Sequence, residues 1–215
     1  MIKALFWDND GVLVDTERLY FKANKEILAR VGIRLTNEMF VEFFLRQGRG
    51  AWHIVEGKGF DRDAIQRMRD ERNAIYGELL RQEAKAIEGA AETLRTLHET
   101  HIMGIVTSSR KDHFAMIHRR TDLLRHVDFV LADGDYARHK PDPDPYLAAV
   151  ERSGCLPEEC VAVEDSERGL LAAKAAALKC LIIPTALTRG GDFSRADKVL
   201  RTIREVPSVL LSLSV

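Results

Sequence analysis

Residues 2–12 read Ile2-Lys3-Ala4-Leu5-Phe6-Trp7-Asp8-Asn9-Asp10-Gly11-Val12, and this segment is the most informative part of the sequence. Its first half is a short run rich in large apolar residues, which predicts a buried strand, and Gly11 predicts a sharp turn after it. The carboxylates of Asp8 and Asp10 therefore follow the carboxyl end of a strand, where open α/β sheets bind their ligands. Carboxylate oxygens suit Mg²⁺, and an ionised carboxylate is a competent nucleophile for phosphoryl transfer. An ordinary solvated turn is the alternative, but the position directly after a buried strand favours a ligand site.

Similar apolar runs recur along the chain and alternate with helical patterns. This alternation predicts an α/β fold, a Rossmann-like and mostly parallel sheet whose two faces are covered by helices. The predicted strands are residues 2–7, 102–106, 128–131, 160–163 and 180–183, of which 128–131 is the weakest. The predicted helices between them are residues 90–99, 111–124, 144–153 and 168–177.

One region, from residue 16 to about residue 85, contains helical patterns and no convincing strand. Its apolar side chains recur at helical spacing. They are Leu19, Ala23, Ile27 and Val31, then Met39, Phe40, Phe43 and Phe44, and finally Ile65, Met68, Ile75 and Leu79. We therefore predict an α/β core formed by residues 1–15 and 88–215, with an inserted α-helical cap over residues 16–87. Residues 204–215 are apolar enough to form a packed terminal helix.

The composition excludes several classes of partner. The 215 residues include 32 Lys and Arg against 33 Asp and Glu, so no net field attracts nucleic acid or an acidic membrane. The basic cluster His118-Arg119-Arg120 is interpreted as a solvated helix face. The three cysteines, Cys155, Cys160 and Cys180, have no metal-ligand spacing and are predicted to be buried thiols in a reducing cytoplasm. Without an apolar run of membrane length or a leader before the first strand, we expect a cytoplasmic protein that is a monomer by default.

Two further polar clusters follow predicted strands. Thr107-Ser108-Ser109 comes directly after the second strand; its hydroxyls suit either the cap of the next helix or, with free backbone amides, a phosphate site. Lys140-Pro141 follows the weaker strand, and Pro141 stiffens the loop and so fixes where Lys140 points. That lysine is either an exposed loop residue or a cation placed to neutralise a phosphoryl oxygen or a crowded carboxylate site.

Glu164-Asp165-Ser166 follows the strand at residues 160–163, again at the edge of the sheet where ligands bind. Ser166 is in position to cap the next helix, and the adjacent acids would also favour the helix dipole without any ligand. The metal interpretation gains weight because Asp8 and Asp10 need further oxygen ligands.

Taken together, the clusters resemble the four motifs of the haloacid dehalogenase-like hydrolase superfamily, in its phosphatase and phosphomutase branch with a helical cap. The stretch from Asp8 to Glu17 is similar to the first motif, Thr107-Ser108-Ser109 to the second, Lys140-Pro141 to the third and Val163-Glu164-Asp165-Ser166 to the fourth. The resemblance covers nearly the whole chain, and residues 16–85 lie where that family inserts its cap.

The resemblance implies a mechanism. Asp8 would attack phosphorus to form an aspartyl phosphate, and Asp10 would protonate the leaving oxygen and then take a proton from water. Mg²⁺ would be bound by Asp8, the main-chain carbonyl of Asp10 and Asp165, with Glu164 in an ancillary position. Thr107, Ser108 and Lys140 would bind the transferring phosphoryl group.

The chain departs from the family pattern in places. Ala175-Ala176-Ala177-Leu178 stands where relatives usually have glycine at the end of a helix, and Tyr20 stands where mutase-like relatives often have histidine. In the cap, Arg46-Gln47-Gly48-Arg49-Gly50 resembles the loop that faces the active site. Arg49 is therefore a candidate for binding the far side of the substrate, and a solvated surface arginine is the alternative.

The leading hypothesis is a Mg²⁺-dependent phosphatase that acts on a small phosphorylated metabolite, with sugar phosphates as one class. A phosphosugar mutase similar to beta-phosphoglucomutase is the nearest alternative. A receiver-type signalling domain also uses an acidic pair, a Thr and a Lys, but it would be shorter and would lack the helical insertion. A non-catalytic binding module is disfavoured, because every expected catalytic side chain is present.

Overall fold

The computed structural model describes residues 1–213, and the last two residues of the predicted terminal helix lie outside this range. The chain divides into two compact units, one formed by Met1–Asp15 with Lys85–Val215 and the other by Thr16–Ala84. At the point where the chain leaves the first unit and returns to it, the backbone N–H of Asp15 donates to the carbonyl of Lys85 at 3.0 Å. The two units are described in turn.

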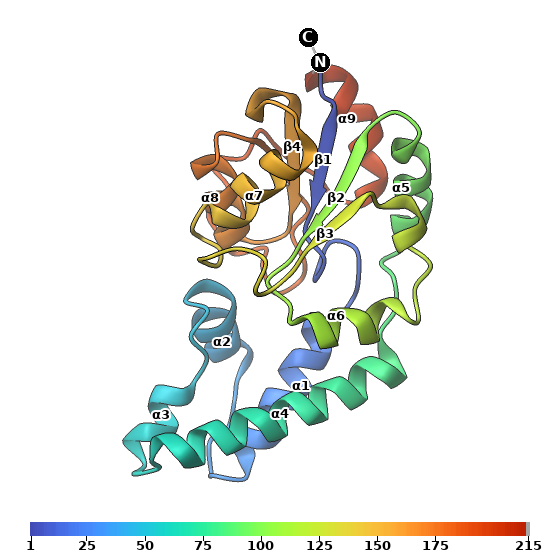
Figure 1. The fold of residues 1–215 in the computed structure, drawn as a ribbon. Helices are drawn as coiled ribbons and strands as arrows, with labels where there is room; N and C mark the ends of the chain where they lie inside the picture. Colours follow the sequence, from blue (N-terminus) through green and yellow to red (C-terminus); the bar gives the residue numbers. More distant parts are fainter. Residues whose placement is uncertain (214–215) are drawn as a thin grey trace. The chain divides into compact units, whose positions relative to one another are not determined.

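The first unit is built on a six-stranded sheet in the order β3-β2-β1-β4-β5-β6, and every pairing is parallel (Figure 1). The strands are β1 (Ala4–Trp7), β2 (Ile102–Val106), β3 (Phe129–Leu131), β4 (Cys160–Glu164), β5 (Lys179–Ile182) and β6 (Lys198–Val199). The predicted Rossmann-like α/β fold is confirmed, with β1 near the centre of the sheet. Strand β6 was not predicted, because two exposed residues carry no periodicity.

Helices cover both faces of the sheet, with α7 and α8 on one face and α5 and α9 on the other (Figure 1). The helices of this unit are α5 (Ala90–His98), α6 (Lys111–His118), α7 (Asp144–Ser153), α8 (Glu167–Ala175) and α9 (Val206–Leu213). Phe6, Ala162 and Leu170 belong to one buried cluster between the sheet and the α7–α8 layer. Burying such a side chain contributes roughly 2 kcal/mol, so this layer holds the strand ends in place.

Helix α6 was predicted to reach residue 124, but it ends at His118. The chain then turns, and the Nδ1 atom of His118 lies 2.8 Å from the hydroxyl of Thr121. A single helical turn, Leu124–His126, follows as a separate 3₁₀ element. The prediction was too long because the apolar periodicity continues across a turn that a side-chain hydrogen bond stabilises.

The end of α8 has an alanine where a glycine is usual. The backbone N–H of Leu178 donates to the carbonyl of Ala173 at 3.0 Å, and that of Ala177 donates to Lys174 at 3.1 Å, which is the Schellman pattern. Ala177 has φ = 61°, and no other non-glycine residue of the described chain has a positive φ. A side chain with a Cβ atom is strained in this conformation. The sequence departure at this helix end therefore has a structural cost.

An Ala177→Gly variant is expected to raise the free energy of unfolding by about 1 kcal/mol, because glycine adopts positive φ without strain. Gly154 provides the control, since it is a glycine with a left-handed backbone, φ = 68°, directly after the end of α7. Gly154→Ala should lower stability by a similar amount. Urea denaturation of both variants and the parent checks this, and an Ala177→Gly variant no more stable than the parent would show that this helix end is unstrained.

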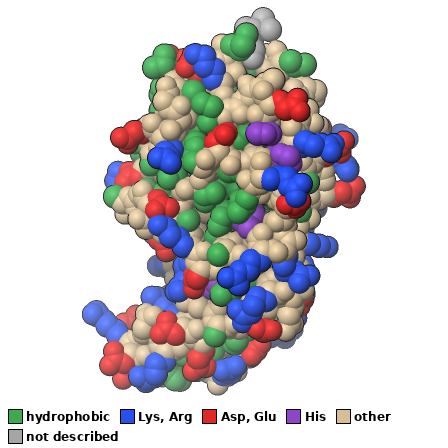
Figure 2. Space-filling model, turned by 45° about the vertical axis from the view of Figure 1, so that its right-hand side comes forward, with side chains coloured by type: hydrophobic (Ala, Val, Ile, Leu, Met, Phe, Trp, Pro, Cys, Tyr) green, Lys and Arg blue, Asp and Glu red, His purple; other side chains and the backbone are tan. Residues whose placement is uncertain are grey.

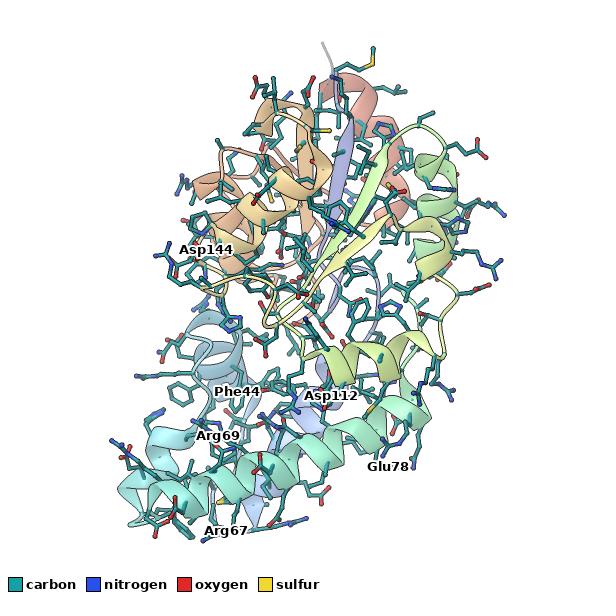
Figure 3. All side chains as sticks on the ribbon, viewed as in Figure 1. Phe44, Arg67, Arg69, Glu78, Asp112 and Asp144 are labelled. Carbon is teal, nitrogen blue, oxygen red and sulfur yellow. The ribbon has the colours of Figure 1, made fainter. Side chains whose placement is uncertain are left out.

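The regular secondary structure of the second unit, residues 16–84, is helical. It contains α1 (Glu17–Ala29), α2 (Asn37–Phe40), the π-helical segment η1 (Val41–Arg46), α3 (Trp52–Gly57) and α4 (Arg62–Glu83). Helices α1 and α4 pack along each other (Figure 1). Phe44, labelled in Figure 3, is buried and stacks on Phe40 with ring centroids 5.1 Å apart. Helix α3 was not predicted, and Val31 lies beyond the end of α1.

A buried arginine lies inside this helical unit. Arg72 of α4 is 8% exposed, and its Nη1 atom donates to the hydroxyl of Tyr20 at 2.6 Å and to Oδ1 of Asn24 at 2.9 Å. Its guanidinium lies 4.9 Å from the ring centre of Tyr20 and 5.8 Å from that of Trp52. The side chains that accept hydrogen bonds from this guanidinium are Tyr20, Asn24 and Asn73, and all three are neutral.

The surface carries both signs of charge. Figure 2 shows acidic and basic side chains interspersed over the visible face. Among the described residues, none of the helices combines the length and apolarity needed to span a membrane. The three cysteines are free thiols. Cys160 and Cys180 are buried as predicted, whereas Cys155 is only partly buried, so the prediction is wrong for that residue.

Candidate active site

The polar clusters singled out in the sequence meet at one edge of the sheet. Strand β1 pairs with β2 on one side and with β4 on the other, with Trp7 opposite both Ile105 and Val163. Because all these strands are parallel, the residues that follow them emerge side by side at their carboxyl ends. This places Asp8 between the segment after β2 and the segment after β4.

Lys140 is the centre of a buried ionic cluster. Its Nζ atom donates to Oδ1 of Asp8 at 2.6 Å, to Oε1 of Glu164 at 2.6 Å and to the carbonyl of Val106 at 2.8 Å. An ammonium group has three N–H donors, so every donor has an acceptor. Lys140 is 5% exposed, and the alternative of an exposed loop lysine is wrong.

The electrostatics of this cluster keep Lys140 charged. Burial alone would lower the pKa of Lys140, but Asp8 and Glu164 outweigh it and raise that pKa. Burial raises the pKa of Asp8 to about 8, with Glu164 and Asp10 acting in the same direction and Lys140 opposing them. The carboxylates around Asp8 therefore outnumber the cation that the protein supplies, which favours a further cation at this site.

Glu164 holds Lys140 in place. Its Oε1 atom accepts from Lys140 and from the hydroxyl of Tyr146 at 2.7 Å, and Oε2 accepts from Asp165 N and Ser166 Oγ, each at 3.3 Å. Both oxygens of this fully buried carboxylate are thus engaged by protein donors. Sequence reasoning missed Tyr146, because a tyrosine on the apolar face of α7 is indistinguishable from a core residue.

The loop that carries Lys140 is anchored on both sides. Arg168 donates from Nε to the carbonyl of Lys140 at 3.1 Å and also from Nη2. Arg138 pairs with Asp144, labelled at the start of α7 in Figure 3, at 2.8 Å. Tyr136, from the same loop, donates its hydroxyl to the carbonyl of Thr107 at 2.7 Å. These contacts join the second, third and fourth motifs, and no sequence pattern indicated them.

The hydroxyls after β2 bind Asp10 and do not cap the next helix. Ser109 Oγ donates to Oδ2 of Asp10 at 2.6 Å, and Thr107 Oγ1 donates to the same oxygen at 3.3 Å. Helix α6 begins after Arg110, which makes no side-chain cap hydrogen bond. Ser108 is exposed, whereas Thr107 is buried. In contrast, Ser166 does cap its helix, since its side chain accepts from the N–H of Gly169 at 3.2 Å.

Two glycines allow the carboxylates to come this close. A Cβ atom on Gly11, where φ is 88°, would lie 2.5 Å from Oδ2 of Asp165. A Cβ atom on Gly169 would lie 1.9 Å from the carboxyl carbon of Glu164. Gly11 was recognised as a turn residue, but the need for Gly169 could only be seen once α8 had been placed against β4.

The donor set fits a divalent cation. Asp8, Glu164 and Asp165 each offer a carboxylate oxygen, and these atoms lie within 4.8 Å of one another in buried positions. Carboxylate oxygens are the ligands that Mg²⁺ prefers. Because both oxygens of Glu164 already accept hydrogen bonds, Asp8 and Asp165 are the better candidates for direct ligands.

Arg49 lies in the helical unit as predicted, in the turn between η1 and α3, and its side chain is exposed. Its contact with a substrate stays a prediction. One other predicted feature lies differently from expectation. His118 is 8% exposed, so the interpretation of residues 118–120 as a solvated face is wrong for this residue. A histidine at the end of a short helix gave no signal of its buried contacts.

Comparison with known proteins agrees with this geometry. The sequence model of the haloacid dehalogenase-like hydrolases matches residues 5–183. A phosphorylated carbohydrates phosphatase of Thermotoga maritima is 30% identical over 184 residues, which are 83% of each chain. Protein CbbY of Rhodobacter capsulatus is 30% identical over 207 residues, or 91% of each chain. The crystal structure of a CbbY mutant from Rhodobacter sphaeroides in complex with xylulose-(1,5)bisphosphate is 25% identical, with a TM-score of 0.80 over 95% of this chain and 96% of that one.

The chain therefore belongs to the haloacid dehalogenase-like hydrolases, and it is a phosphoric monoester hydrolase of that family.

Proposed function

We propose that this protein is a Mg²⁺-dependent phosphatase that hydrolyses a small sugar phosphate through an aspartyl phosphate on Asp8. The observation that carries the proposal is the buried Lys140 ammonium, 2.6 Å from both Asp8 and Glu164. An ionised carboxylate held against a fixed cation is a nucleophile with a defined orientation. The names of two relatives, which refer to phosphorylated carbohydrates and to xylulose-(1,5)bisphosphate, support the sugar phosphate class.

The roles of the residues follow from their contacts. Lys140 orients Asp8 through Oδ1, and the carboxylate attacks phosphorus as the ester oxygen leaves. Asp10 protonates that oxygen and later removes a proton from the water that attacks the aspartyl phosphate. Lys140, Thr107 and Ser108 are the proposed donors to the phosphoryl oxygens.

Asp8, Asp165 and the main-chain carbonyl of Asp10 would bind the metal, with Glu164 in an ancillary position. The bound cation would supply positive charge that offsets the repulsion between the carboxylate and the phosphate. Lys140 and the bound cation would together offset this repulsion. Lys140 is part of the protein, whereas the cation must bind from solution.

The metal prediction separates the two acids of the fourth motif. Asp165→Asn is expected to raise the Mg²⁺ concentration for half-maximal activity by more than about 10-fold, whereas Glu164→Gln should mainly lower kcat.

Burial raises the pKa of Asp8 to about 8 in the metal-free protein, so Mg²⁺ must displace a proton. Its affinity should therefore rise as the pH increases from 6 to 8. Titration calorimetry with Mg²⁺ on chelator-treated protein measures the affinity of the parent at each pH and of both variants. Equal losses of Mg²⁺ affinity in both variants would contradict the assignment, and a larger loss in Glu164→Gln would reverse it.

Recognition of the rest of the substrate is proposed to involve Arg49 of the helical unit. This arginine is exposed in a loop between two helical segments. Its contribution stays a prediction.

Phosphosugar mutase activity is the alternative, since it would use the same Asp8, Asp10, metal and Lys140. Tyr20 favours the phosphatase, because a phenol is a poor proton relay near neutral pH and its oxygen here accepts a hydrogen bond from Arg72. A panel of sugar phosphates, followed by phosphate release and by ³¹P NMR, tests the choice. We expect free phosphate without a bisphosphate activator. An isomerised sugar phosphate that accumulates faster than phosphate would favour the mutase, and turnover of no phosphate ester would overturn both.

A further inference from the structure

Asn9, between the two acids of the first motif, is part of a buried hydrogen-bond chain. Its Nδ2 atom donates to Oδ2 of Asp10 at 3.2 Å, and its Oδ1 atom lies 2.9 Å from Nε2 of His118. The other ring nitrogen of His118, Nδ1, lies 2.8 Å from the hydroxyl of Thr121. Asn9 is fully buried, and His118 and Thr121 come from the end of α6 and the turn after it.

We propose that Asn9 and His118 are positioning residues that orient the carboxyl group of Asp10 for proton transfer. The inference rests on the proposed function, because it assigns a task to the residue that gives and takes the proton there. It gives a task to Asn9, which lies between the two acids of the first motif, and to His118, which lies outside the four motifs, and neither touches the reacting atoms.

The chain of hydrogen bonds has one consistent direction when Asp10 is ionised. An ionised carboxylate only accepts, so the neighbouring Asn9 must present its amide nitrogen to Asp10 and its oxygen to His118. That oxygen in turn requires a hydrogen on Nε2 of His118. In neutral imidazole Nδ1 is then the acceptor, and the Thr121 hydroxyl donates to it. The tautomer of one histidine thus determines how the amide faces Asp10.

The surroundings of His118 favour the neutral ring. Burial lowers the pKa of His118 to about 4, and the charge of Asp10 opposes this only in part. The ring of Phe114 packs against the imidazole, with centroids 4.3 Å apart. His118 is therefore a fixed donor to Asn9 at neutral pH and does not exchange protons itself.

The same oxygen of Asp10 is fixed from several directions. Oδ2 accepts from Asn9, Ser109 and Thr107. An oxygen that already accepts three hydrogen bonds is a poor place for a proton, so the transferred proton belongs on Oδ1. Without Asn9 and His118, the carboxyl group loses a constraint on its rotation, and the proton is less often aimed at the leaving oxygen.

The test uses the leaving group as a reporter. Cleavage of an alkyl phosphate needs a proton on the departing oxygen, whereas 2,4-dinitrophenolate leaves without one. We expect Asn9→Leu and His118→Phe to lower kcat/KM for a sugar phosphate by about 10- to 100-fold, part of the 10²- to 10⁴-fold that a general acid supplies. For 2,4-dinitrophenyl phosphate the loss should stay below about 3-fold. His118→Gln, whose amide retains a donor, should recover part of the activity on the sugar phosphate.

Controls separate positioning from packing. Asp10→Asn should show the same preference for the good leaving group, but more strongly. His113, also buried on α6, serves as the packing control, and His113→Gln should affect both substrates equally. If Asn9→Leu lowers kcat/KM equally for both substrates, the proposal is overturned and Asn9 is only a core residue.

A second readout is independent of turnover. In ¹⁵N NMR spectra of the parent between pH 6 and 8, we expect His118 to be neutral with its hydrogen on Nε2. A hydrogen on Nδ1, or a cationic ring, would overturn the direction of the chain. If the parent hydrolyses neither phosphate ester, the proposed function fails and the role assigned to Asn9 fails with it. If the parent is active but Asn9→Leu loses activity equally on both substrates, only the positioning role is overturned.

Discussion

An Asp8→Asn variant is expected to lose turnover by about 10⁴-fold or more while keeping its fold, which is the scale seen when a covalent nucleophile is removed. The amide has nearly the same shape as the carboxylate, and its oxygen can still accept the hydrogen bond that Lys140 now donates to Oδ1 at 2.6 Å. It has no negative charge with which to attack phosphorus. Release of inorganic phosphate under multiple-turnover conditions measures the loss.

The variant also separates chemistry from binding. Because Lys140 and Thr107 are unchanged, phosphate should still bind, and the melting temperature should stay close to that of the parent. In the parent, rapid acid quench with ³²P-labelled substrate should trap label on the protein, and in the variant it should not. Substantial multiple-turnover activity of Asp8→Asn would contradict the aspartyl phosphate mechanism.

A Gly169→Ala variant is expected to lose both stability, by about 3–5 kcal/mol, and most of its activity. The added methyl carbon would lie 1.9 Å from the carboxyl carbon of Glu164, so the carboxylate has to move. Glu164 is fully buried and accepts from Lys140 and Tyr146, and a displaced carboxylate leaves the Lys140 ammonium buried with a partner lost. Breaking a buried ion pair has an effect of this size. Guanidinium denaturation and phosphate release measure the two losses.

Helix propensity alone predicts the opposite sign, because alanine stabilises a helix by about 1 kcal/mol relative to glycine. Gly57 in α3 is the matched control, since a Cβ atom there would meet nothing within 4 Å. Gly57→Ala should be neutral or stabilising. Adding Glu164→Asp to Gly169→Ala shortens the displaced side chain and should restore part of the stability. A Gly169→Ala variant as stable and active as the parent would show that the Glu164 carboxylate is not held as described.

The order of elements and the chemistry of the motifs were readable from the sequence, because both depend on local patterns. An apolar run such as residues 4–7 predicts a buried strand irrespective of the residues that follow it. Two acids directly after such a run therefore lie at the end of a strand. Parallel pairing then places Asp8 beside the segments after β2 and β4. Asp8, Asp10, Thr107, Lys140 and Asp165 could therefore be predicted together as one site.

What each residue does within the site was decided by contacts between segments far apart in the chain. Lys140 is buried between Asp8 and Glu164, which are 132 and 24 residues away, and no local pattern distinguishes this lysine from a solvated one. Tyr146 and His118 look like an ordinary core residue and an ordinary surface residue until their helices are packed. Gly169 looks like a weak position in a helix until the carboxylate of Glu164 occupies the space beside it. Periodicity and motif order in the sequence were thus enough to predict the fold and the candidate reacting groups. The buried partners that orient those groups could not be predicted, because burial and hydrogen-bond direction depend on atoms that folding brings together.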